Sequence, residues 1–153
     1  MKKYIIPVLA MLMFLLSIPA NVFASENREM QFFGVGADVQ GNNLGEYTVK
    51  TKGEKAEEGF VFTPQKPFTS TSILFSVELK GEGTVILKIS ETNAQGQFIK
   101  EETKQVQLTS DWTQHVLPFQ LESTSSQVDV FVLTDNQKAT EFSFRNVQVK
   151  ESN

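Results

Sequence analysis

The chain has no cysteine and a single histidine among its 153 residues. Without cysteine it forms no disulfide, binds no metal through thiolates and has no thiolate nucleophile. A lone histidine excludes a zinc site built from several histidines, and it leaves any Ser-His-Asp triad dependent on one residue. The missing cysteine also excludes the lipid attachment of a bacterial lipoprotein. The folded domain must therefore depend on packing alone for its stability.

Basic side chains are also scarce. Without Lys2 and Lys3, which belong to the N-terminal segment, 12 of the 14 lysines and arginines remain against 18 acidic residues, a net charge of −6. A surface of this sign repels phosphate groups. We therefore expect neither nucleic acid nor an anionic membrane surface as a partner.

Long apolar runs are absent except at residues 5–18. This run follows Lys2-Lys3 and precedes Val22-Phe23-Ala24, the pattern of a cleaved signal peptide covering residues 1–24. The alternative is an uncleaved membrane anchor, but the run is shorter than the about 20 residues that a membrane span needs. We therefore expect one domain, residues 25–153, that is secreted and has no membrane contact after cleavage.

The remainder of the chain alternates between apolar and polar residues. Every second residue is apolar from Ile73 to Leu79 and from Val85 to Ile89, which predicts half-buried strands. Residues 128–133 are apolar on both faces, which predicts a central strand. Turn-forming sequences recur about every 10 to 16 residues, and no window has a convincing helical repeat. We therefore expect an all-β sandwich of eight or nine antiparallel strands, with one of them in residues 30–39.

The last apolar run, residues 141–150, changes phase halfway along. Phe142 and Phe144 alternate with polar residues, but the next apolar pair, Val147 and Val149, is shifted by one position. An extra residue in one strand of an antiparallel pair has this effect, because it reverses which face each side chain points to. The sequence therefore predicts a β-bulge at Arg145-Asn146.

From Leu74 onward these features follow a specific order. Trp112 ends the stretch "TSDW", inward-facing positions follow at His115, Leu117 and Phe119, and residues 142–149 close the domain with the shifted strand. This order resembles the C-terminal half of carbohydrate-binding modules of families four and nine. The resemblance covers the 80 residues 74–153. It implies a jelly-roll β-sandwich that binds polysaccharide.

In those modules an aspartate at the break in the last strand commonly helps to hold a structural calcium ion. Here that position is Arg145, whose guanidinium repels a cation. The family's "asparagine-x-x-phenylalanine-glutamate" signature, which supplies other calcium ligands, is missing from residues 26–39. We therefore expect the fold without a metal ion. Arg145 should instead pair with a carboxylate or cap backbone carbonyls near the bulge.

Residues for catalysis are few. We expect His115 to be packed inside and hydrogen-bonded, because it alternates with Leu117 and Phe119. Adjacent acids on one strand point to opposite faces, whereas a glycosidase holds two acids across a cleft. The pairs Glu57-Glu58 and Glu101-Glu102 are therefore interpreted as solubilising charge. We predict that the chain is not an enzyme and needs no cofactor.

Sugar binding needs aromatic faces flanked by amides and charges. The chain has 13 phenylalanines, most at inward positions, but beyond residue 24 its amphipathic aromatics are Tyr47 and Trp112. Trp112 begins a core strand and is either packed or exposed, and Tyr47 could face either way. Lys88 and Gln114, at outward positions of their strands, complete the predicted ligand-binding set.

Two functions follow from these observations. The first is a secreted, non-catalytic module that binds a cell-wall or biofilm polysaccharide through the concave sheet, as the resemblance implies. The second is an extracellular matrix or surface protein that uses the sandwich to contact another protein, which the scarcity of tyrosine and tryptophan favours. An exposed ring of Tyr47 or Trp112 beside Lys88 and Gln114 would favour the first.

Overall fold

The computed structural model describes residues 30–65 and 67–152. The expected signal peptide, residues 1–24, lies outside the described residues. The ten strands in the described part are β1 (Phe33–Val35), β2 (Ala37–Gly41), β3 (Tyr47–Thr51), β4 (Gly59–Phe62), β5 (Ser72–Gly81), β6 (Thr84–Thr92), β7 (Phe98–Gln107), β8 (Thr113–Gln120), β9 (Gln127–Thr134) and β10 (Glu141–Glu151). These residues form no helix, so none of them could cross a membrane in that form. The all-β prediction is confirmed.

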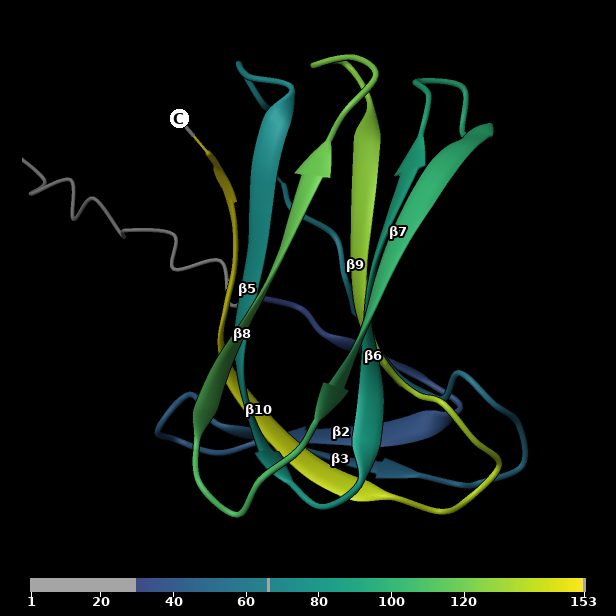
Figure 1. Cartoon of the computed structure of the whole chain (residues 1–153), viewed down its shortest axis with the longest axis vertical. Helices are drawn as coiled ribbons and strands as arrows, with labels where there is room; N and C mark the ends of the chain where they lie inside the picture. The colour runs from purple at the N-terminus through teal and green to yellow at the C-terminus, as the bar shows by residue number, and fades with distance from the viewer. Residues whose placement is uncertain (1–29, 66, 153) are drawn as a thin grey trace, which may run out of the picture.

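The strands form two five-stranded sheets that pack face to face (Figure 1). Sheet A has the order β1-β4-β9-β6-β7 and sheet B the order β2-β3-β10-β5-β8, with antiparallel pairing throughout. In Figure 1, β10 curves along the lower left of the molecule, so sheet B bends around the core and its outer face is convex. The predicted sandwich is confirmed.

The strand count exceeds the expected eight or nine because residues 30–39 do not form one strand. The chain turns at Gly36, which has a φ of 60°. A Cβ at this position would lie 2.8 Å from the side chain of Glu58, so the turn needs glycine for space as well as for conformation. β1 before the turn pairs with β4 in sheet A, and β2 after it pairs with β3 in sheet B.

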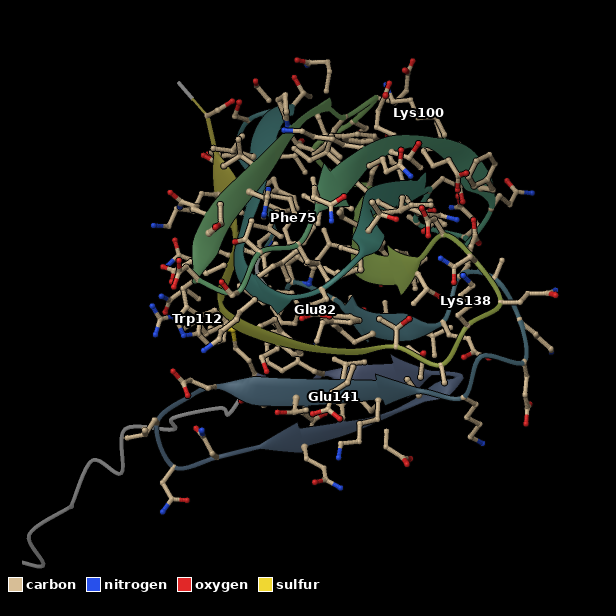
Figure 2. All side chains as sticks on the ribbon, turned by 60° about the horizontal axis from the view of Figure 1, so that its bottom comes forward. Phe75, Glu82, Lys100, Trp112, Lys138 and Glu141 are labelled. Carbon is tan, nitrogen blue, oxygen red and sulfur yellow. The ribbon has the colours of Figure 1, made fainter. Side chains whose placement is uncertain are left out.

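The core lies between the two sheets and follows the predicted alternation. Phe75, Val77 and Leu79 of β5 have no exposed surface, and Phe75 lies between the sheets in Figure 2. Burying each such side chain contributes about 1.5–3 kcal/mol of transfer free energy. β9 is the middle strand of sheet A, as its two apolar faces predict, and Leu133 on its outer face is only 2% exposed.

The predicted β-bulge in β10 is confirmed. The register against β5 shifts between Arg145 and Gln148, and Asn146 has a φ of 52°. Phe142 and Phe144 before the bulge and Val147 after it all belong to the core. The extra residue therefore keeps the core-facing side of β10 apolar although the sequence changes phase.

Candidate functional site

The four predicted ligand-binding residues lie in three different parts of the molecule. Gln114 is on the outer face of sheet B, opposite Glu78 of β5, and Trp112 precedes it on the same face. Lys88 is on the outer face of sheet A, because its neighbours in β6 fill the core. Tyr47 points into the sandwich. The four side chains therefore do not form one groove, and their contact with a ligand stays a prediction.

Trp112 is half-buried at the margin of sheet B (Figure 2). The guanidinium carbon of Arg145 lies 4.4 Å from the centre of the indole, and the ammonium of Lys80 lies 6.0 Å from it. Both cations are close enough for a cation–π attraction. The ring face that Arg145 covers is therefore not available for stacking on a sugar.

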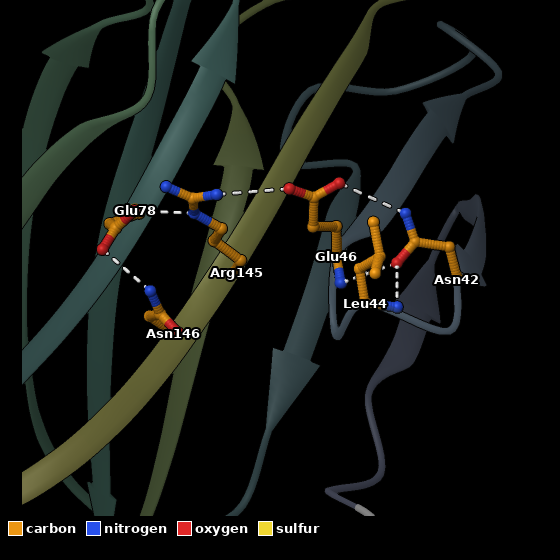
Figure 3. A network of polar contacts seen from close by, with 6 residues as sticks. All are labelled: Asn42, Leu44, Glu46, Glu78, Arg145 and Asn146. Carbon is orange, nitrogen blue, oxygen red and sulfur yellow. Dashed lines mark hydrogen bonds and ion pairs between the residues drawn. The ribbon is translucent and has the colours of Figure 1, made fainter.

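Arg145 is the centre of a polar network on sheet B (Figure 3). Its Nε donates to Oε2 of Glu78 at 2.7 Å, and its Nη1 donates to Oε1 of Glu46 at 3.2 Å. The bulge residue Asn146 donates from Nδ2 to the other oxygen of Glu78 at 2.8 Å. Asn42, in the turn between β2 and β3, donates to Glu46 at 3.2 Å. The predicted pairing of Arg145 with a carboxylate is confirmed.

This network sets the charge states of its members. The hydrogen bonds from Asn146 and then Arg145 hold the pKa of Glu78 below its ordinary value. In return, the hydrogen bond to Glu78 raises the pKa of Arg145. The position that the resemblance gives to a calcium-binding aspartate thus carries a cation of its own. Among residues 30–65 and 67–152, no three histidine or acidic side chains gather as a metal site would require.

Tyr47 belongs to an aromatic cluster at the end of the core. Its ring stacks on Phe144, with centroids 4.9 Å apart and an interplanar angle of 10°. Phe32 meets both rings edge-on, at 4.7 Å from Tyr47 and 4.8 Å from Phe144. Phe60 continues the stack on Phe144 at 3.8 Å. Tyr47 is half-buried, so most of its ring serves packing.

The outer face of sheet A is built from parallel rows across four strands. Residues that pair directly in neighbouring strands lie side by side on one face. The central row is Val61, Phe131, Lys88 and Thr103, from β4, β9, β6 and β7. The row on one side is polar and consists of Asp129, Ser90 and Glu101. The row on the other side consists of Leu133, Ile86 and Gln105. The aromatic ring of Phe131 thus lies between a polar row and a row that is apolar except at Gln105.

Lys88 is held tightly on this face, with only 15% of its side chain exposed. Its Nζ lies 3.5 Å from Oε2 of Glu57 and 3.2 Å from Oε2 of Glu101. It also lies 5.8 Å from the centre of the Phe131 ring. Glu57 has a φ of 62°, a backbone conformation that residues other than glycine rarely adopt. Such strain is typical of functional sites.

The border of the face is also ordered by hydrogen bonds. Asp135 accepts from Thr84 Oγ1 at 2.6 Å and from Gln105 Nε2 at 2.7 Å. The bond from Thr84 is the main reason that the pKa of Asp135 lies below its ordinary value. Asp129 accepts from the hydroxyl of Thr63. The alternation in residues 127–134 already placed Phe131 and Leu133 on the face opposite the valines, but it did not identify that face as the outer one or name its partners.

The interpretation of Glu57-Glu58 as solubilising charge is wrong for Glu58, whereas Glu57 is exposed. Glu57 pairs with Lys88, and Glu58 is 3% exposed. The Glu58 carboxylate accepts from the backbone N–H of Gly53 at 2.6 Å and of Glu54 and Lys55 at 3.0 Å. Burial opposes its charge, but the backbone donors together outweigh burial and lower the pKa of Glu58. The Glu58 carboxylate thereby fixes the β3–β4 loop, and this loop places Glu57 beside Lys88 on the outer face of sheet A.

His115 lies on the core side of β8 with Leu117 and Phe119, as predicted, but the expected hydrogen bond is not found at its buried Nε2. That atom has no partner among the described residues. Burial, and secondarily the charge of Lys104, lower the pKa of His115. The histidine therefore packs as a neutral ring, remote from the rows of sheet A.

Comparisons with known proteins identify the fold and no single family. No family model and no curated protein matches the chain. Among solved structures, it resembles a family 11 carbohydrate-binding module from Clostridium thermocellum in complex with a β-1,3-1,4-mixed-linked tetrasaccharide. The TM-score is 0.59 at 15% identity, over 80% of this chain and 89% of that one.

Two further likenesses are of the same kind. The family 29 module CBM29_1 from Piromyces equi gives a TM-score of 0.61 at 9% identity, over 80% of each chain. A family 4 module gives 0.55 at 15% identity, over 76% of this chain and 79% of that one. The resemblance to families four and nine is therefore confirmed at the level of the fold, while other families match equally well. The chain has the jelly-roll β-sandwich fold found in carbohydrate-binding modules.

Proposed function

We propose that this chain is a secreted, non-catalytic module that binds polysaccharide through the outer face of sheet A. The observation that carries the proposal is the central row of that face, in which Phe131 lies between Val61 and Lys88. The jelly-roll fold that the chain shares with carbohydrate-binding modules supports the same function.

The chemistry of the face suits a sugar chain. The C–H surface of a pyranose packs on an aromatic ring, while its hydroxyls take hydrogen bonds from polar groups around the ring. Phe131 supplies the ring, and Lys88, Thr103 and Glu101 supply donors and acceptors on one side of it. The ion pair between Lys88 and Glu101 already fixes these two side chains, so they lose little side-chain entropy on binding.

The same face offers no assembled catalytic group. Catalysis of hydrolysis needs a nucleophile or an activated water with a base in reach. Of the acids on this face, Glu57 and Glu101 are paired with Lys88, and Asp129 accepts from the hydroxyl of Thr63. The histidine of the chain is packed on the core side of β8. Binding without chemistry is therefore the function that the arrangement supports.

The test is a pull-down of residues 25–153 on insoluble glucan, xylan, chitin and peptidoglycan. We expect retention on at least one of them. Phe131→Leu keeps the apolar volume but removes the ring face, and it should weaken retention about tenfold. Phe98→Leu is the matched control, because Phe98 is 64% exposed at the start of β7, outside the rows, and it should bind like the wild type.

Absence of retention on all four polymers would contradict the proposal. A partner protein would then be the better interpretation of the sandwich. Secretion is a separate element of the proposal, and it depends on cleavage after residue 24. Sequencing the N-terminus of the exported protein should give Ser25.

A further inference from the structure

Sheet B opens into a groove where β3 and β10 separate. Their pairing ends at Phe144 and Tyr47, whereas β10 continues along β5 as far as Glu151. Beyond Phe144, β10 therefore has a described strand on one side only. A groove of about 1100 Å³ lies in this gap, bounded by residues 30–33, the β2–β3 turn and the bulge of β10. Its volume lies just above the range of about 300–1,000 Å³ typical of small-molecule sites.

Aromatic rings line one wall of the groove. Phe32 and Tyr47, both half-buried, line the groove, and Phe144, which has no exposed surface, supports them from the core through stacked and edge-on contacts. Tyr47 is half-buried, so part of its ring remains accessible from the groove. A preformed aromatic wall of this kind packs against the C–H face of a pyranose with little loss of entropy.

Amide side chains line the other parts. Five of the 15 lining residues are amides: Gln31, Asn42, Asn43, Asn146 and Gln148. Asn42 is occupied within the chain, because its Oδ1 accepts from the backbone N–H of Leu44 and Glu46. Asn43 and Gln148 are exposed. Each amide offers both donors and an acceptor, which matches the dual character of sugar hydroxyls.

The bulge itself contributes an amide to the groove. The extra residue, Asn146, is exposed and has a φ of 52°, and its Nδ2 is fixed by Glu78 at 2.8 Å. Bulges re-aim side chains next to binding sites. Here the bulge keeps the core apolar and places Asn146 among the residues that line the groove. Figure 3 shows that its amide nitrogen is directed at Glu78 of β5.

The groove carries almost no charge, although 21% of the residues in the chain are charged. Arg145 is the one charged residue among the 15 that line it. Its guanidinium is neutralised by Glu46 and Glu78 at 3.2 and 2.7 Å. A charged ligand would lose its hydration shell in the groove without gaining an opposite charge to pair with. The groove therefore fits a neutral molecule with many hydroxyl groups.

We propose that this groove is a second binding site, specific for a neutral oligosaccharide. It goes beyond polysaccharide binding by the outer face of sheet A, because it lies at the gap between β3 and β10 and uses none of the residues of the Phe131 row. Tyr47 and Phe32 form the stacking wall. Asn43, Asn146 and Gln148 supply hydrogen bonds to the hydroxyls.

The experiment is a titration of ¹⁵N-labelled residues 25–153, which include every described strand, followed by NMR. Cellohexaose, xylohexaose and chitohexaose are the neutral probes. Hexagalacturonate, a glucosamine hexamer and a neutral extended hexapeptide are the comparison ligands. We expect at least one neutral sugar to shift the amide signals of Asn43, Asn146 and Gln148. The charged sugars and the peptide should leave these signals unchanged.

Variants then assign the site. Asn146→Gly keeps the left-handed backbone but removes the amide, and Gln148→Ala removes another; each should weaken the groove titration about tenfold. Gln95→Ala, in the exposed β6–β7 turn, should titrate like the wild type. Phe131→Leu should not change the groove shifts even where it abolishes retention on insoluble polymer.

Each contrary result has a defined meaning. If polymer retention depends on Phe131 while no sugar shifts the groove signals, the second site is refuted and the function of sheet A stands. If the groove responds while no polymer is retained, sheet A fails and the groove stands. Shifts caused by the peptide or by a charged sugar at the same amides, in preference to the neutral sugars, would overturn the assignment of the ligand.

Discussion

Arg145 of β10 and Glu78 of β5 are direct partners across the two strands, and their side chains meet at 2.7 Å immediately before the register shifts. The contact fixes the position at which the bulge begins. Because Glu46 accepts from the same guanidinium at 3.2 Å, the contact also joins the β2–β3 hairpin to the centre of sheet B. The bulge is thus held by side chains as well as by the pattern of the core.

Arg145→Met should therefore lower the melting temperature by a few degrees, because it leaves Glu78 and Glu46 without their cation and Trp112 without its stacking partner. Lys50→Met is the control. It breaks a pair with Glu141 whose side chains are 58% and 62% exposed, and exposed pairs contribute little. Thermal unfolding followed by circular dichroism measures both. Equal melting temperatures for the two variants would show that the Arg145 network has no structural role.

The bulge also makes a prediction about Asn146. Its φ of 52° lies in the left-handed region, which costs most L-residues about 1–2 kcal/mol but is tolerated by asparagine and glycine. Asn146→Ala should therefore be less stable than Asn146→Gly by about 1–2 kcal/mol, although both lose the same hydrogen bond to Glu78. Urea unfolding gives the difference directly. If alanine is as stable as glycine, the backbone at the bulge is not left-handed in solution.

Much of the fold could be predicted because alternation and turns are local signals. The phase change at Arg145-Asn146 located the bulge, and the two apolar faces of residues 128–133 located the central strand. The break at Gly36 was not predicted, because "FFGVGADV" alternates without interruption through it. The structure shows why this position needs glycine: a Cβ at Gly36 would lie 2.8 Å from the side chain of Glu58.

The candidate site was harder to predict for a geometric reason. Alternation shows that Lys88 and Gln114 point outward, but it does not show that β6 and β8 belong to different sheets. The sequence left open which way Tyr47 faces. The pairing of β3 with β10 in the structure places its ring against Phe144. Glu58 looks like a surface charge, and its burial depends on three backbone donors in a loop without a sequence motif.

Glu58 provides a prediction about acid stability. Its lowered pKa means that its contribution to stability is present above its ordinary pKa of 4.5 and is lost as the pH falls below that value. Glu58→Gln should lower the melting temperature clearly at pH 7, with a smaller difference from the wild type at pH 3. Glu54→Gln, an exposed neighbour in the same loop, serves as the control and should match the wild type at both values. A Glu58→Gln deficit that is the same at pH 3 and pH 7 would show that the carboxylate charge is not what holds the loop.

His115 should make the stability of the fold depend on pH in a second range, above that of Glu58. Burial favours the neutral ring and lowers its pKa in the folded state, so its contribution is intact above the ordinary value of 6.5 and declines as the pH falls below it. Because it is the only histidine in the chain, stability between pH 7.5 and 5.5 should decrease in the wild type and stay level in His115→Leu. Urea unfolding at several pH values across this range measures the slope. A His115→Leu curve that falls in parallel with the wild type would place the titrating group elsewhere.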